Sequence, residues 1–107
     1  MKTRIMYIED KSGGLVGEAR IGRVRFSKTG STLYYGGKNF RSLEGRGSKA
    51  NFYDVESGDH FWISGCKKRG SNQLYGREGF TFIDEDVREE FWNEIRDELE
   101  RKTQTRI

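Results

Sequence analysis

Alternating apolar and polar positions predict several short β-strands in the first three quarters of the chain. The clearest pattern covers residues 49–68, where two strand-like segments flank Ser57-Gly58. A two-residue turn at this point sets Val55 opposite His60, and Tyr53 opposite Trp62. One face of the hairpin then carries Val55, Tyr53, His60 and Trp62, and the other carries Phe52, Phe61 and Ile63. Because both faces are apolar, the hairpin must be covered on both sides or present an aromatic face to a ligand.

Further strands are predicted on both sides of this hairpin. Residues 3–9 and 19–28 have strand-like patterns, and a shift of apolar phase at Gly22-Arg23 predicts a β-bulge. Residues 32–35 and 38–43 flank Gly36-Gly37, which suits a type I′ turn with Leu33 opposite Phe40.

A last hairpin is predicted between residues 73–75 and 80–83. Residues 70–80 weakly repeat the glycine and aromatic positions of residues 30–40. In a chain rich in glycine and tyrosine, chance explains this echo slightly better than duplication does.

The last quarter of the chain has the periodicity of a helix. Val87, Phe91, Ile95 and Leu99 recur every four residues, and Asp86 with Glu89 resembles a capping box. We therefore predict one amphipathic helix over residues 84–102, packed on one face of the sheet so that it covers one side of the aromatic hairpin. Residues 103–107 are predicted to be a tail.

Together these elements predict a single α+β domain over residues 1–107, with a β-rich body at 1–83. About five to seven antiparallel strands form a strongly bent sheet or a small SH3-like β-barrel, with one C-terminal amphipathic helix against it. The predicted core consists of Ile5, Tyr7, Val24, Phe26, Leu33, Phe40, Phe52, Phe61, Ile63, Phe91, Ile95 and Leu99.

Composition and charge narrow the class of protein. One cysteine and one histidine exclude an internal disulfide and a zinc cage, and no apolar stretch has the length of a membrane span. We therefore expect a cytoplasmic protein with no metal, no cofactor and no membrane partner. The net charge of +3 divides unevenly, because residues 1–83 hold 15 Lys/Arg and 8 Asp/Glu, whereas residues 84–107 hold 5 and 9. The positive net charge of residues 1–83 favours binding of an anion.

Several blocks of the sequence resemble a group of small, uncharacterised bacterial proteins of about this length. These blocks are RIMYIE (4–9), ARIGRV (19–24), TLYY (32–35), KANFYDVESGDHFWISG (49–65), LYG (74–76) and IDEDVREEFW (83–92). The resemblance covers nearly the whole chain. It implies a compact single domain in the bacterial cytoplasm, and it implies no activity.

A non-catalytic binding module that acts on another macromolecule fits this sequence best. Surface Tyr, Trp and Arg favour a protein partner, in the manner of an inhibitor or an adaptor. The alternative is single-stranded nucleic acid, because basic residues interleave with aromatic residues on the strands and loops. The residues predicted to bind are Tyr34, Arg41, Arg46, Lys49, Tyr53, Trp62, Lys67, Lys68 and Arg69. The sequence leaves the identity of the partner and the oligomeric state open.

A third class, a small enzyme, depends on Cys66 and His60. Cations at residues 67–69 are expected to lower the pKa of the Cys66 thiol, and His60 is a possible general base. However, a lone cysteine without a placed base is usually structural. The chain also has no glycine-rich phosphate-binding motif, and no pair among its helical carboxylates stands out. We therefore expect no catalysis.

Overall fold

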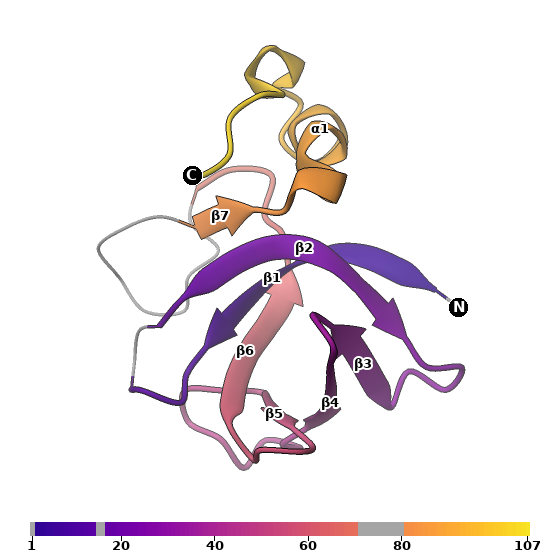
Figure 1. Cartoon of the computed structure of the whole chain (residues 1–107), viewed down its shortest axis with the longest axis vertical. Coiled ribbons are helices and arrows are strands. Elements are labelled where there is room, and N and C mark those ends of the chain that lie inside the picture. Colours follow the sequence, from indigo (N-terminus) through magenta and orange to yellow (C-terminus); the bar gives the residue numbers. More distant parts are fainter. Residues whose placement is uncertain (1, 15–16, 71–80) are drawn as a thin grey trace.

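The computed structural model describes residues 2–14, 17–70 and 81–107, and in these residues seven strands form one sheet (Figure 1). The strands are β1 (Thr3–Asp10), β2 (Ala19–Phe26), β3 (Thr32–Tyr35), β4 (Lys38–Ser42), β5 (Phe52–Asp54), β6 (His60–Gly65) and β7 (Thr81–Ile83). Their order is β1-β6-β5-β4-β3-β2-β7, and β1 also pairs with β2. This extra pairing closes the first six strands into an antiparallel barrel.

The predicted architecture, a small bent β-barrel with one C-terminal helix, is confirmed, and it is consistent with the predicted SH3-like barrel. β7 lies outside the barrel and pairs in parallel with the first residues of β2. The predicted partner of β7, residues 73–75, lies outside the described residues, as does most of the echo over residues 70–80.

The β3–β4 hairpin has the predicted turn and register. Gly36 and Gly37 have φ angles of 58° and 77°, and Leu33 pairs with Phe40. Both angles lie in the left-handed region that glycine adopts without steric cost, so the type I′ turn follows from the sequence.

The register predicted for the β5–β6 hairpin is wrong by two residues, because Tyr53 pairs with His60 and not with Trp62. The turn contains four residues instead of two. Its geometry is fixed by Asp54, whose carboxylate accepts hydrogen bonds from the Glu56 N–H and the Ser57 hydroxyl. Because side chains alternate with a period of two, a shift of two leaves the predicted faces unchanged.

The bulge predicted at Gly22-Arg23 is also wrong. β1 and β2 pair without interruption from Thr3↔Arg25 to Glu9↔Ala19. The apolar phase shifts because β2 is covered on both faces. Val24 packs inside the barrel, whereas Ile21 packs on the outside.

Two hydrophobic clusters therefore lie on the two faces of β1 and β2. The barrel core consists of Met6, Ile8, Val24, Leu33, Phe40, Phe61 and Ile63. The outer core consists of Ile5, Tyr7, Ala19, Ile21, Ile83, Val87, Phe91 and Trp92, and Trp62 packs against it. Trp62 of the aromatic hairpin thus lies against the outer core, while Tyr53 and His60 stay half-buried.

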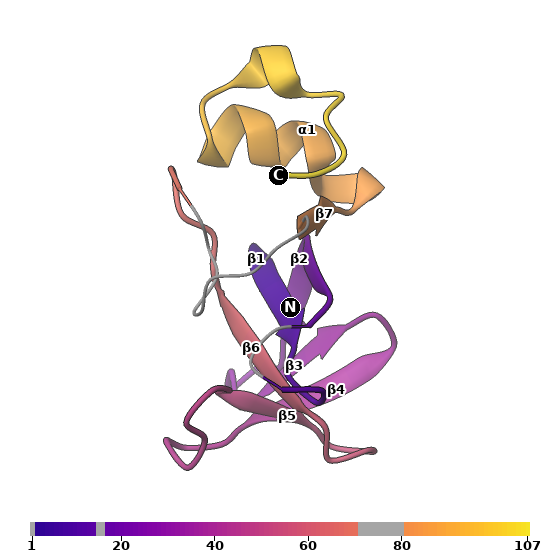
Figure 2. The same cartoon turned by 90° about the vertical axis from the view of Figure 1, so that its left-hand side faces the viewer.

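The C-terminal segment lies across one end of the barrel (Figure 2) and is shorter than the predicted helix. Helical turns run through Glu85–Val87, Arg88–Glu90 (α1) and Phe91–Ile95, and a separate turn covers Leu99–Arg101. The prediction of one helix over residues 84–102 is therefore wrong beyond Ile95. The predicted capping box is wrong as well, because the helical segment follows Asp84 and no side chain caps it.

The helical segment ends where the chain turns back at Asp97, whose φ angle is 55°. The returning chain lets the Trp92 indole N–H donate to the Gln104 carbonyl, and it pairs residues 105–107 with β7. The predicted tail is thus an additional β-like segment. These hydrogen bonds satisfy the open edge of β7, which a longer helix would leave without a partner.

Most of the predicted core is buried, with one clear exception. Leu99 is 42% exposed, because it lies beyond the end of the helical segment. Phe26, Phe52 and Ile95 are half-buried and pack against the edges of the two cores. The other predicted core residues are buried.

Candidate binding site at the barrel mouth

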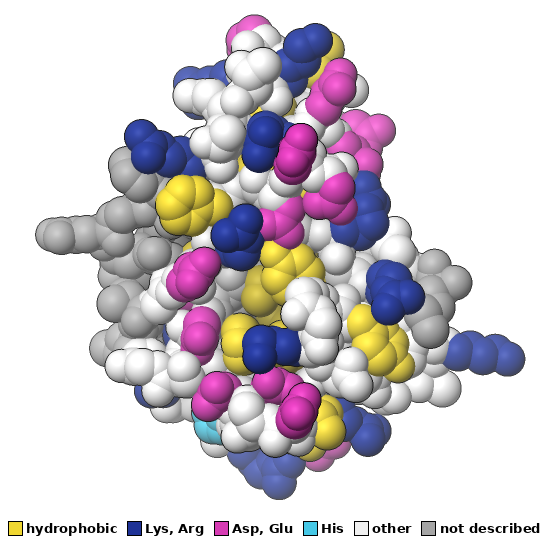
Figure 3. Space-filling view, in the orientation of Figure 1, with side chains coloured by type: hydrophobic (Ala, Val, Ile, Leu, Met, Phe, Trp, Pro, Cys, Tyr) yellow, Lys and Arg dark blue, Asp and Glu magenta, His cyan; other side chains and the backbone are white. Residues whose placement is uncertain are grey.

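The barrel is open on one side, because β2 pairs with β3 only at Arg25↔Tyr34 and Phe26↔Leu33. The opening is a hollow of about 210 Å³, which we call the barrel mouth. In Figure 3 it lies at the centre of the face, where hydrophobic side chains are surrounded by charged ones. It is lined by Ile8, Asp10, Glu18, Arg20, Tyr35, Gly36, Lys38, Phe40 and Phe61.

The barrel mouth has an apolar floor and a charged rim, and the alternation of the strands explains both. Inward-facing positions of β1 carry Ile8 and then Asp10, and those of β4 carry Phe40 and Lys38. The deeper residue of each pair is buried in the barrel core. The residue nearer the strand end reaches solvent at the rim, where a charge is tolerated.

Asp84 joins the rim to the C-terminal segment. Its carboxylate accepts hydrogen bonds from the Tyr35 hydroxyl at 2.5 Å and from Arg20 Nε at 2.7 Å. Gly22 lies beneath this contact, because a Cβ atom there would come within 2.4 Å of both the Tyr35 ring and the Asp84 carboxylate. Only glycine leaves room for the contact between Tyr35 and Asp84.

These contacts fix the charges at the rim. Burial, reinforced by the hydrogen bond to Asp84, raises the pKa of the Tyr35 phenol above its usual value. The hydrogen bond from Arg20 to Asp84 likewise raises the pKa of the Arg20 guanidinium. At neutral pH the phenol is therefore neutral, and the guanidinium is charged and held in place.

Lys38 forms the second ion pair of the rim, with its ammonium 3.4 Å from the Asp54 carboxylate. Burial of Asp54 by itself raises the pKa of this carboxyl group. The hydrogen bonds from Ser57 and Glu56, together with Lys38, outweigh burial and lower the pKa below its usual value. Asp54 is therefore ionised at neutral pH.

Two further rim carboxylates differ in their partners, because Asp10 has no ion pair with a described residue whereas Glu18 has a long one. Asp10 accepts hydrogen bonds from the Ser12 N–H and hydroxyl, and Glu18 is 3.7 Å from Arg20. The hollow itself is lined by two carboxylates, Asp10 and Glu18, and two cations, Arg20 and Lys38. Asp84 and Asp54 do not line the hollow but pair with these two cations, and with them the local charge is −2. This region is acidic although residues 1–83 as a whole are basic.

The predicted binding residues are brought together only in part. Tyr34, Arg41 and Tyr53 lie on the outward face of β3, β4 and β5. Arg46 and Lys49 lie in the loop that follows β4, and Trp62 packs against the outer core.

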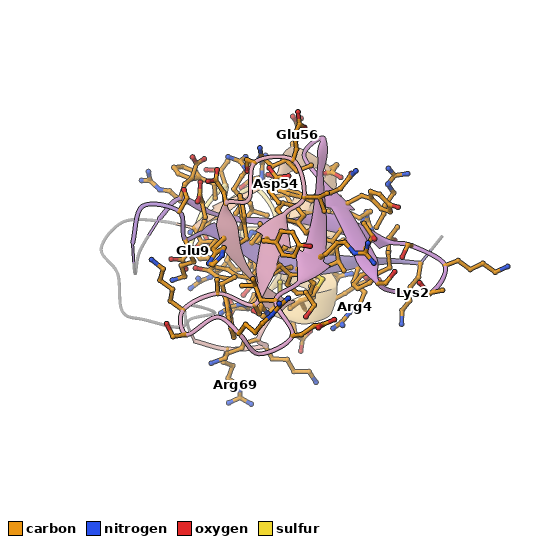
Figure 4. All side chains as sticks on the ribbon, turned by 90° about the horizontal axis from the view of Figure 1, so that it is seen from below. Lys2, Arg4, Glu9, Asp54, Glu56 and Arg69 are labelled. Atoms are coloured by element: carbon orange, nitrogen blue, oxygen red, sulfur yellow. The ribbon has the colours of Figure 1, made fainter. Side chains whose placement is uncertain are left out.

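The cations Lys67, Lys68 and Arg69 follow β6, and the last two lie beside residues 93–98. Figure 4 shows Arg69 on the side of the molecule opposite to Asp54 and Glu56. Arg69 is therefore remote from the barrel mouth, and none of the three cations lines it.

Sequence reasoning did not find the residues of the mouth. One signal is visible in retrospect, because Arg20 and Lys38 break the apolar alternation at inward-facing positions near strand ends. Asp84 gives no such signal, since it is 64 residues from Arg20 in the chain.

The proposed reactive pair, Cys66 and His60, is not a pair in space. The residues lie at opposite ends of β6, about 20 Å apart for an extended strand of this length. Burial raises the pKa of the Cys66 thiol to about 12 and outweighs the nearby Arg96 and Arg4. The expected lowering of this pKa is therefore wrong, and the thiol is protonated at neutral pH.

Two further findings concern the part of the chain that the structure describes. No group of three or more His, Cys, Asp or Glu residues there could hold a metal ion. No helix among the same residues has the length and apolar character needed to cross a membrane.

Comparisons of the chain with protein-family models, with curated proteins and with solved structures find no match. The resemblance to small bacterial proteins therefore stays a prediction. The function has to be inferred from the barrel mouth and the surfaces around it.

Proposed function

We propose that the protein is a non-catalytic binding module whose barrel mouth receives one apolar side chain of a partner protein. The observation that carries this proposal is the apolar floor of Ile8, Phe40 and Phe61 at the bottom of an open, charged rim. Binding sites commonly combine an apolar lining with a few fixed polar groups. The volume of about 210 Å³ is smaller than the roughly 300 Å³ at which sites for drug-sized ligands begin. It suits a single side chain.

The acidic rim supports a basic partner segment. Asp10 forms no ion pair with a described residue, and the exposed Glu18 makes only a long contact of 3.7 Å with Arg20, so each is accessible to a lysine or arginine of the partner. The same negative charge disfavours the phosphates of a nucleic acid at this site. A bacterial cytoplasmic setting, in which thiols stay reduced, fits the free Cys66.

A phage-displayed library of random peptides, panned against the wild-type protein, tests this proposal. We expect enriched peptides in which a large apolar residue lies next to Lys or Arg. The double variant Asp10→Lys/Glu18→Lys should weaken their binding about tenfold or more, because rim repulsion replaces attraction. Methyl NMR signals of Ile8 should shift on binding, since this side chain forms the floor.

A matched control reverses two exposed charges outside the mouth, in Glu56→Lys/Asp59→Lys. This variant should bind the selected peptides with nearly wild-type affinity. Peptides that lose affinity equally in both variants would be attracted by overall charge, which contradicts a site at the mouth. The absence of any enriched peptide would also contradict the proposal.

A further inference from the structure

A second surface has the opposite character to the barrel mouth. On the outward face of the barrel, cross-strand pairing places Arg25 beside Tyr34 and Tyr34 beside Asn39. A neighbouring row places Thr32 beside Arg41, Arg41 beside Tyr53, and Tyr53 beside His60. We call these seven residues the cationic face. None of the seven is acidic.

The two arginines of the cationic face are available to an anion. Both side chains are exposed, and neither Arg25 nor Arg41 forms an ion pair with a described residue. The Arg25 guanidinium lies 5.5 Å from the centre of the Tyr34 ring, so a cation–π contact holds it against the sheet. By contrast, Arg23, two residues earlier on β2, forms an ion pair with Glu90, with 2.7 Å between its guanidinium nitrogen and the carboxylate oxygen.

The two tyrosines lie on the strands to either side of Arg41 but in different rows, because Tyr53 pairs with Arg41 whereas Tyr34 pairs with Asn39, two residues along β4. Tyr34 on β3 and Tyr53 on β5 lie two strands apart, about 10 Å in the direction across the sheet, and Arg41 lies on β4 between these strands. Both tyrosines are half-buried, so their rings have fixed positions and still reach solvent. A shallow hollow of about 340 Å³ adjoins Tyr34, Arg25 and Asn39, with Asp86 also lining it.

We propose that the cationic face binds single-stranded nucleic acid, independently of the barrel mouth. Arg25 and Arg41 contact phosphates, and the rings of Tyr34 and Tyr53 stack on bases to either side of Arg41. Charge complementarity selects an anion, and the alternation of rings with guanidinium groups selects one that also carries flat bases. The site excludes Lys67, Lys68 and Arg69, which lie beyond β6 near the helical segment.

Fluorescence anisotropy of a fluorescein-labelled oligothymidylate, measured with the full chain over a range of salt concentrations, tests this proposal. We expect binding at low salt that weakens as salt rises. The variant Arg25→Gln/Arg41→Gln should reduce the slope of log K against log salt by about 1.4, at roughly 0.7 for each lost contact with a single strand. Tyr34→Leu/Tyr53→Leu should weaken binding about tenfold or more at constant charge.

The matched control is Lys67→Gln/Lys68→Gln, which removes the same two charges elsewhere and should leave the affinity within about twofold of wild type. An equal loss in both charge variants, or no binding at low salt, would overturn the proposal. If the tyrosine variant binds normally, the protein recognises only the negative charge, and the proposed stacking site is overturned. Polyglutamate that binds as tightly as the oligothymidylate would overturn it in the same way. Asp10→Lys/Glu18→Lys should retain oligothymidylate binding, so this proposal and the peptide proposal can fail separately.

Discussion

The barrel core and the outer core lie on opposite faces of the same two strands, and they are built in different ways. The barrel core draws its residues from strands alone and is entirely apolar. The outer core combines β1 and β2 with β7 and the helical segment, so it forms only when the end of the chain returns to the sheet. One core thus follows from alternation within strands, whereas the other depends on contacts between distant parts of the chain.

The outer face of β1 also contains a buried polar cluster that the barrel core lacks. The Lys11 ammonium is 2.7 Å from the Glu9 carboxylate, and both side chains are fully buried. The Tyr7 hydroxyl and the Gly17 N–H also donate to Glu9. A buried ion pair persists only when its hydrogen bonds are satisfied, so this cluster ties β1 to the chain that follows it.

Removing the ring of Phe91 is the strongest way to break the outer core. We expect Phe91→Ala to lower the free energy of unfolding by about 3–5 kcal/mol, because the side chain is fully buried and leaves a cavity. Leu99→Ala is the matched control, because Leu99 is 42% exposed and should cost less than about 0.5 kcal/mol. Urea denaturation measures both values. A loss near zero for Phe91→Ala would contradict docking of the helical segment.

Replacing one partner of the buried ion pair should lower the stability of the protein more than replacing both partners. We expect Lys11→Met to cost about 3 kcal/mol, because it leaves the Glu9 carboxylate buried without its cation. Adding Glu9→Gln should restore part of this loss, since the buried charge is then removed. Thermal unfolding of the wild type, of Lys11→Met, of Glu9→Gln and of the double variant forms the comparison. A double variant as unstable as the sum of both single changes would show that the pair is not coupled.

Tyr35→Phe tests the link between the barrel mouth and the C-terminal segment. Loss of the hydrogen bond to Asp84 should cost about 1 kcal/mol at neutral pH. The folded state raises the pKa of this phenol, so the unfolded chain loses its phenol proton first as the pH rises past 10. The stability that the phenol provides is therefore complete below pH 10 and is lost above it.

The difference in stability between the wild type and Tyr35→Phe should accordingly shrink above pH 10. Urea denaturation at neutral pH and at several alkaline pH values measures this difference. A constant difference across that range would mean that the hydroxyl contributes nothing through its proton.

The local features of this protein follow from short stretches of its sequence. Period-two alternation located the strands, the Gly36-Gly37 pair set one hairpin with its register, and the spacing of Val87, Phe91 and Ile95 identified the buried helical face. Each of these features depends on residues within a few positions of one another. Backbone sterics and side-chain period are sufficient to decide them.

Features that depend on residues far apart in the chain follow from tertiary contacts and could not be predicted from local patterns. The four-residue turn after Asp54 set the β5–β6 register, and the covering of both faces of β2 replaced the predicted bulge. The helical segment stopped at Ile95 because the returning chain offered partners to β7. The barrel mouth arose where β2 leaves β3 and Asp84 reaches Arg20. Long-range pairing decides such features, because backbone and charged groups find their hydrogen-bond and ion-pair partners in distant parts of the chain, and a local sequence pattern does not identify these partners.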